Sequence, residues 1–243
     1  MAQKILKEEE IEIKLFFKEY KYKIVKKRTF DFLYTKNLNY DYMSFKFNVR
    51  LQKSFNFEDG GNYLLKITLD TLDFTNFNIE SLANIDLDKI YIEIFPARKF
   101  DYNTLKLQEC FEIITKVENY IFKKLKDKSF ISSQYNIFNN FIRYNEKSVF
   151  FSAPFFSNFT LGFIEIANEN YDRAKLCYEY FVLHALDYIK PFEKNPDYEM
   201  MIKYVSTRIQ LSNEIINLIE NDQKVVYQKY ADILSKLDKE LKW

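Results

Sequence analysis

The residues of this chain that could do chemistry are few, and three of them are glutamates in the same tripeptide. Ile-Glu-Ile surrounds Glu12, Glu93 and Glu165. Apolar residues on both sides of a polar one favour a strand with alternating faces, so three neighbouring strands could gather the carboxylates around a hard divalent cation. The simpler interpretation puts each glutamate on the wet face of a half-buried sheet, beside a basic partner on the next strand. We prefer it, because no closely spaced acidic pair accompanies the tripeptides.

The other catalytic residue types are isolated. His184 is the single histidine and falls on an apolar helical pattern, where a packed role is common. Cys110 and Cys177 have no ligand spacing around them, and they resemble small core residues. One histidine and unclustered cysteines argue against a zinc site. Only three glycines are present, which argues against phosphate loops, nucleophile elbows and dinucleotide fingerprints. We therefore expect no cofactor, no metal and no catalytic residue, and a chain that is more readily a non-enzyme.

Composition places the chain among globular proteins. It has 243 residues, of which 47% are hydrophobic and 19% aromatic, so the core must be built largely from rings. The net charge of +1 gives no general attraction for nucleic acid or acidic membranes. Two cysteines and a polar start predict a cytoplasmic protein without disulfides.

One stretch, residues 148–164, is uncharged and rich in phenylalanine. A spanning helix needs about 20 apolar residues, and this stretch is shorter and contains Pro154 and Asn158. We expect a buried hairpin there and no membrane span.

The clearest strand pattern covers residues 43–73. Apolar and polar residues alternate on both sides of Glu58-Asp59-Gly60-Gly61, and an Asp-Gly step supplies the positive φ that a hairpin turn needs. Alternation also predicts strands at 10–18, 20–26, 29–34, 90–94, 149–156 and 161–166. Apolar residues at intervals of three and four predict helices from about 104 to 128 and from 170 to 189.

The last segment, residues 197–243, contains neither glycine nor proline. Its apolar residues follow a heptad-like seam with polar interruptions at Ser212 and Gln223. One helix of this length would reach about 70 Å at roughly 1.5 Å per residue, which exceeds the width of a domain of this size. The helix must therefore break near Asn221-Asp222 and fold back, or project and meet a partner.

These elements predict an α+β fold: a mostly antiparallel sheet with helices packed on one face, followed by a long C-terminal helix or helical hairpin. We expect an α+β domain over residues 1–190 and a helical segment over 191–243. Within the first, the repeated strand-helix pattern suggests two units, about 1–128 and 129–190.

The first functional hypothesis is a non-catalytic protein that binds another protein or itself, as a complex subunit, adaptor or inhibitor. It depends on the missing catalytic residues, the abundance of Tyr and Phe, and a C-terminal seam larger than one domain needs. The predicted contact residues lie on that seam: Ile209, Ile216, Val226, Tyr230, Ile233 and Trp243.

The alternative is a nucleic-acid-binding protein. Residues 14–28 interleave cations with aromatic residues, as a groove for single strands does, and the same pattern fits an edge hairpin kept soluble by lysines. The predicted contacts are Lys14, Lys18, Lys21, Lys23, Lys26, Lys27 and Arg28. A metal-dependent enzyme using the strand glutamates is a third hypothesis. Partner, pathway and oligomeric state are not encoded in any of these patterns.

Overall fold

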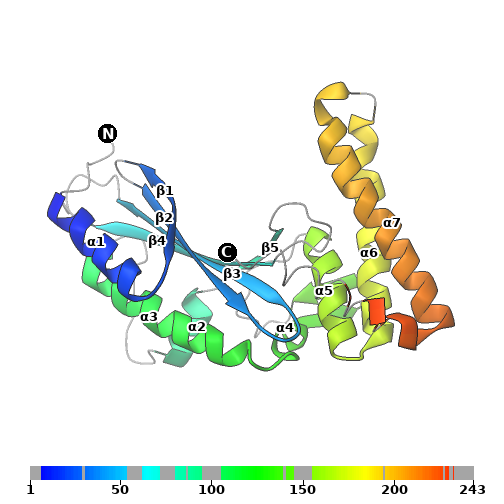
Figure 1. The fold of residues 1–243 in the computed structure, drawn as a ribbon, viewed down its shortest axis with the longest axis horizontal. Helices are drawn as coiled ribbons and strands as arrows, with labels where there is room; N and C mark the ends of the chain where they lie inside the picture. Colours follow the sequence, from blue (N-terminus) through cyan, green and yellow to red (C-terminus); the bar gives the residue numbers. More distant parts are fainter. Residues whose placement is uncertain are drawn as a thin grey trace.

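The computed structural model describes residues 7–28, 31–53, 62–71, 80–85, 87–94, 105–138, 141–144, 155–193, 195–226, 228–229 and 232. It confirms the predicted α+β class, with an antiparallel sheet covered on one face by helices and followed by long helices (Figure 1). The sheet has five strands in sequential order: β1 Lys23–Arg28, β2 Asp31–Asn39, β3 Ser44–Lys53, β4 Tyr63–Thr71 and β5 Glu80–Asn84. The remaining elements are α1 Lys7–Glu19, α2 Leu87–Ile94, α3 Leu107–Lys124, α4 Phe130–Ser133, β6 Tyr135–Phe138, β7 Phe141–Tyr144, α5 Phe155–Ala167, α6 Tyr171–Ile189, η1 Lys190–Phe192, η2 Pro196–Tyr198 and α7 Glu199–Asn221.

The hairpin predicted over residues 43–73 is the centre of the sheet. Strands β3 and β4 pair so that Phe47 faces Leu69 and Val49 faces Ile67, and all four side chains are buried. The residues between them point to the other face. The predicted turn at 58–61 lies outside the described residues.

Rings attach helices α1 and α3 to the buried face of this sheet. Phe17 of α1 stacks on Tyr34 of β2 with ring centroids 3.8 Å apart. Phe122 of α3 meets Phe47 edge to face at 5.5 Å. The two helices also contact each other through the Phe16–Phe111 stack, at 4.1 Å. The aromatic content of the sequence is therefore used chiefly inside the protein, where offset and edge-to-face rings pack well.

The strand predicted over residues 10–18 is wrong, because this segment is helix α1. Only Ile13 and Phe17 are buried, which is the spacing of one helical face, whereas Ile11 and Leu15 are 58% and 62% exposed. The helix has three glutamates in its first turn and Lys18 in its last, and both charges suit the helix dipole.

The strands predicted at 90–94 and 161–166 are also helical, in α2 and α5. Short apolar runs do not distinguish a buried strand from a buried helix. The two strand-helix units inferred from these segments are therefore not present in the predicted form. Of the strand predicted at 149–156, the structure describes only the last two residues, and they begin α5. Among the described helices, none has both the length and the hydropathy needed to cross a bilayer.

Helices α5, α6 and α7 pack together beside the sheet (Figure 1). Phe159 and Phe163 of α5 contact Tyr178 of α6 at ring-centroid distances of 6.1 and 5.7 Å. Arg208 of α7 is fully buried, with its guanidinium carbon 3.3 Å from the Tyr204 ring centre and 5.4 Å from that of Phe159. Burial lowers the pKa of Arg208 to about 9. An aromatic interior thus joins the three helices.

Gly162 allows α5 to approach α6 closely. A Cβ at this position would lie 2.5 Å from Cζ of Tyr178, inside van der Waals contact. We expect Gly162→Ala to lower the free energy of unfolding by about 1–3 kcal/mol, because the Tyr178 ring must shift within a packed core. Urea denaturation checks this, and the double variant Gly162→Ala/Tyr178→Leu should recover part of the loss. An unchanged midpoint for Gly162→Ala would contradict the close packing.

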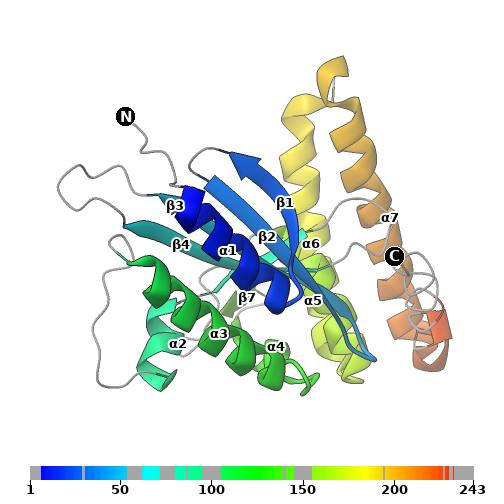
Figure 2. The ribbon, with the colours of Figure 1, turned by 60° about the vertical axis from the view of Figure 1, so that its left-hand side comes forward.

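Of the two alternatives for the C-terminal segment, a break near Asn221-Asp222 or one projecting helix, the structure has the break. Helix α7 ends at Asn221, and Asp222 has φ −157° and ψ 87°. Lys229 then forms an ion pair with Glu214, which requires the chain to reverse, since fifteen residues of continuous helix would separate the two by about 22 Å. Helices α6 and α7 form an antiparallel hairpin, and its end projects away from the rest of the protein (Figures 1 and 2).

Candidate functional site

The three Ile-Glu-Ile glutamates have separate partners. Glu12 on α1 accepts a hydrogen bond from Gln108, and Glu93 on α2 accepts one from the Tyr120 hydroxyl at 2.5 Å. Glu165 lies on α5. Within the described ranges, no group of three His, Cys, Asp or Glu side chains has the arrangement of a metal site. The structure therefore does not bring these carboxylates together.

Glu165 is the most deeply buried carboxylate of the described residues. Its Oε1 lies 2.6 Å from Nε of Arg173 and accepts a hydrogen bond from Ser132, and its Oε2 accepts one from Asn170 at 3.2 Å. Arg173 also donates to the backbone carbonyls of Ser132 and Tyr135. Burial raises the pKa of Glu165 in spite of these partners. The cluster joins α4, α5 and α6 and leaves the carboxylate no access to a ligand.

The histidine and the cysteines also occupy structural positions. Burial raises the pKa of Cys110 to about 12 and that of Cys177 well above its usual value, so neither thiol is a ready nucleophile at neutral pH. The His184 ring packs against Tyr180 at a centroid distance of 4.3 Å.

The predicted protein-contact residues of the C-terminal segment lie largely within the fold. Ile209 and Ile216 are half-buried and pack against the core, and Val226 is buried. The same helix buries Val205 and Ile219. Tyr230, Ile233 and Trp243 lie outside the described residues. The described part of the seam is thus used to hold α7 against its own chain.

A different apolar surface is exposed at the projecting end of the α6–α7 hairpin, which we call the hairpin end. Tyr188, Phe192 and Tyr198 form a ring cluster, with centroid distances of 6.0 Å for the first pair and 4.6 Å for the second. Other exposed apolar side chains lie close to this cluster in the sequence. The exposed members of the hairpin end are Leu183, Leu186, Tyr188, Tyr198 and Met200, whose exposed fractions are 57%, 50%, 39%, 39% and 87%.

Charged side chains border the hairpin end, and most of those that the structure describes are acidic. The exposed carboxylates are Asp187, Glu193, Asp197 and Glu199, and the exposed cations are Lys190 and Lys203. An apolar centre with a charged border is the usual organisation of a protein-binding surface.

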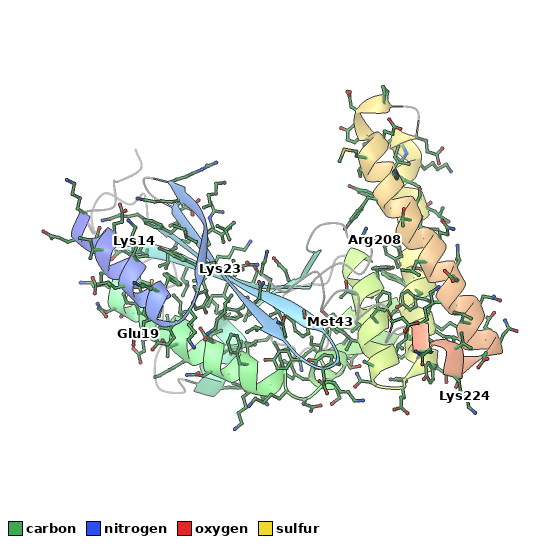
Figure 3. The ribbon with its side chains drawn as sticks, in the orientation of Figure 1. Lys14, Glu19, Lys23, Met43, Arg208 and Lys224 are labelled. Atoms are coloured by element: carbon green, nitrogen blue, oxygen red, sulfur yellow. The ribbon has the colours of Figure 1, made fainter. Side chains whose placement is uncertain are left out.

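The basic segment 14–28 is divided between two sides of the sheet (Figure 3). Lys14 and Lys18 lie on α1, and Lys21 lies in the turn after it with φ 60°. Lys27 points to the α1 side, where it pairs with Glu10, which also pairs with Lys14. The two ion pairs lower the pKa of Glu10 to about 2, with the hydrogen bond from Lys14 as the largest cause. The segment is therefore not one continuous basic surface.

The aromatic residues expected to stack bases also lie in the helix layer. Phe17 and Tyr22 are buried, and Phe16 and Tyr20 pack against the core. The remaining cations of the segment, Lys23, Lys26 and Arg28, lie on strand β1 and are exposed. Strand register assigns all three to the side of the sheet opposite α1 and α3, which none of the described helices covers and which we call the open face.

Three further cations reach the open face from the central strands. Lys46 and Arg50 of β3 and Lys66 of β4 alternate with buried apolar residues. They line a hollow of about 350 Å³ with Val25, Leu33, Asn48, Thr68 and Asp70. Arg50 donates two hydrogen bonds to Asp31, at 2.9 and 2.7 Å, and Asn48 donates one to Asp70 at 2.5 Å. The alternation of β3 and β4 was visible in the sequence, but their register against β1 was not.

The chain matches no family model, no curated protein and no solved structure at a significant level.

Proposed function

We propose that this is a non-catalytic protein that binds another protein through the hairpin end of α6 and α7. The observation that carries the proposal is the exposure of Leu183, Leu186 and Met200 beside the Tyr188–Phe192–Tyr198 ring cluster. Burying such side chains in a partner is favourable by roughly 25 cal/mol per Å² of apolar surface.

The chemistry of this surface suits a protein partner. Tyrosine, phenylalanine and methionine are enriched at protein interfaces. The aromatic side chains cover a large area at a small entropic cost. The acidic border favours a partner whose own apolar patch is surrounded by basic side chains. The hairpin end replaces the seam residues Ile209 and Ile216 as the proposed contact, because those are packed within the chain.

The test compares two variants matched in chemistry. Leu183→Gln/Met200→Gln changes the hairpin end, and Ile11→Gln/Leu15→Gln changes two apolar residues of α1 that are also more than half exposed. Proteins that co-purify with each form are quantified by mass spectrometry, and the partner is then titrated against each form by calorimetry. We expect the first variant to weaken binding at least tenfold, which is about 1.4 kcal/mol.

The α1 variant should bind the partner as the unmodified chain does. Both variants should keep their thermal midpoints within a few degrees, because the substituted side chains are exposed. Equal loss in both variants, or full binding by the hairpin-end variant, would remove this surface from the proposal.

A further inference from the structure

The cations on the two faces of the sheet differ in whether they form ion pairs. On the helix side, Lys27, Lys36 and Lys53 each pair with a carboxylate supplied by α1 or α3: Glu10, Glu118 and Glu9 respectively. On the open face, Asp31 pairs with Arg50. No carboxylate of the described residues lies within ion-pair distance of four further cations of this face, Lys26, Arg28, Lys46 and Lys66. Positive charge is therefore neutralised on one side of the sheet and accumulates on the other.

Strand pairing arranges the open-face cations in rows. Lys26 faces Leu33, Leu33 faces Arg50, and Arg50 faces Lys66, so three cations share one line across four strands. At about 4.8 Å between strands, this line is about 14 Å long. Lys46 lies two rows further along the same face, beyond the Asn48–Thr68 pair, and faces Asp70. Partial burial lowers the pKa of Lys46, although the charge of Asp70 acts in the opposite direction.

We propose that the open face binds the phosphate backbone of a nucleic-acid duplex. Six cations reach it from three strands, namely Lys23, Lys26, Arg28, Lys46, Arg50 and Lys66, whereas the described strand residues place two carboxylates there, Asp31 and Asp70. Duplexes present about one negative charge per 1.7 Å, and their release of counterions drives binding to such a surface.

Two features favour a duplex over other anionic partners. The described residues of β1 to β4 place no aromatic ring on the open face, so bases of a single strand have no platform on which to stack. Lysine is depleted at the centres of protein interfaces, which disfavours an acidic protein as the occupant. Contacts restricted to phosphates carry no base readout, so the binding should be independent of sequence.

The experiment measures binding of a fluorescent duplex of about 20 base pairs at salt concentrations from about 50 to 200 mM. With about five phosphates neutralised, the slope of log K against log salt should be near −4.5. Lys26→Glu/Lys66→Glu should weaken binding about 10- to 100-fold at the lowest salt and reduce the slope by about 2. The matched control Lys18→Glu/Lys21→Glu makes the same charge change on the helix side and should leave both values nearly unchanged.

The outcomes that would overturn the proposal are distinct. The unmodified protein could fail to bind at the lowest salt, or the control pair could weaken binding as much as the open-face pair. A single strand of equal length, or polyglutamate, that binds more tightly than the duplex would assign the face to that partner instead. If Lys26→Glu/Lys66→Glu fails to fold, Lys26→Gln/Lys66→Gln replaces it, with an expected slope change in the same direction.

Discussion

Replacing Phe17 by alanine should lower the free energy of unfolding by about 3–5 kcal/mol. Phe17 is fully buried and stacks on Tyr34 at 3.8 Å, so the substitution leaves a ring-sized cavity between α1 and the sheet. Urea or thermal denaturation followed by circular dichroism measures the loss. The duplex-binding slope of the folded fraction should stay unchanged, because Phe17 lies on the helix side of the sheet.

Leu15→Ala is the matched control for this prediction. Leu15 is 62% exposed, so its truncation should change the stability by no more than about 0.5 kcal/mol. In a strand, residues 15 and 17 would share one face, and truncating either would be costly. Similar losses at the two positions would therefore contradict helix α1 and support the strand that alternation predicted.

The misreading of this segment has a physical origin. Ile11, Ile13, Leu15 and Phe17 satisfy a period of two, but Ile13, Phe16, Phe17 and Tyr20 satisfy the helical period equally well. The charges at the start of the segment favour the helix over the strand, because Glu8, Glu9 and Glu10 lie at the positive end of the helix dipole. The same ambiguity affected 90–94 and 161–166, where β-branched residues suggested strands inside short apolar runs.

The elements with one unambiguous period were predictable. The β3–β4 hairpin alternates over long strands, and α3 and α6 carry a single apolar stripe. The length of the C-terminal segment left two alternatives, a break near Asp222 or a projecting helix, and the structure selects the break. Long periodic segments restrict the alternatives, because a shift in register or period would expose a whole apolar face.

The candidate surfaces were less accessible to sequence reasoning. Lys26, Arg50 and Lys66 meet across strands that are separated along the chain, and only their register aligns them. At the hairpin end, Leu183 and Met200 resemble core residues in sequence, and both are exposed where the α6–α7 hairpin projects away from the rest of the protein (Figure 1). The alignment of the cations and the exposure of the apolar side chains both depend on tertiary packing, so a local sequence pattern does not predict them.

Glu118→Ala should also lower the free energy of unfolding by about 3–5 kcal/mol. Glu118 is 5% exposed on α3 and accepts hydrogen bonds from the Tyr22 hydroxyl, at 2.5 Å, and from Lys36 of β2. Burial, reinforced by the charge of Glu118, raises the pKa of Tyr22, so the phenol stays protonated as a donor. Removing the carboxylate would leave a buried hydroxyl and a largely buried ammonium without their acceptor.

The triple variant Glu118→Leu/Tyr22→Phe/Lys36→Met separates the loss of the ion pair from the cost of leaving its partners buried without an acceptor. Replacing all the partners by apolar groups removes the desolvation cost together with the ion pair, so most of the stability should return. Glu112→Ala, which breaks an exposed Glu112–Lys116 pair on the same helix, should cost no more than about 0.5 kcal/mol. A small loss for Glu118→Ala would show that Lys36 finds water instead. The Lys36–Glu118 ion pair would then neutralise less charge on the helix side, and the charge contrast between the two faces of the sheet would weaken.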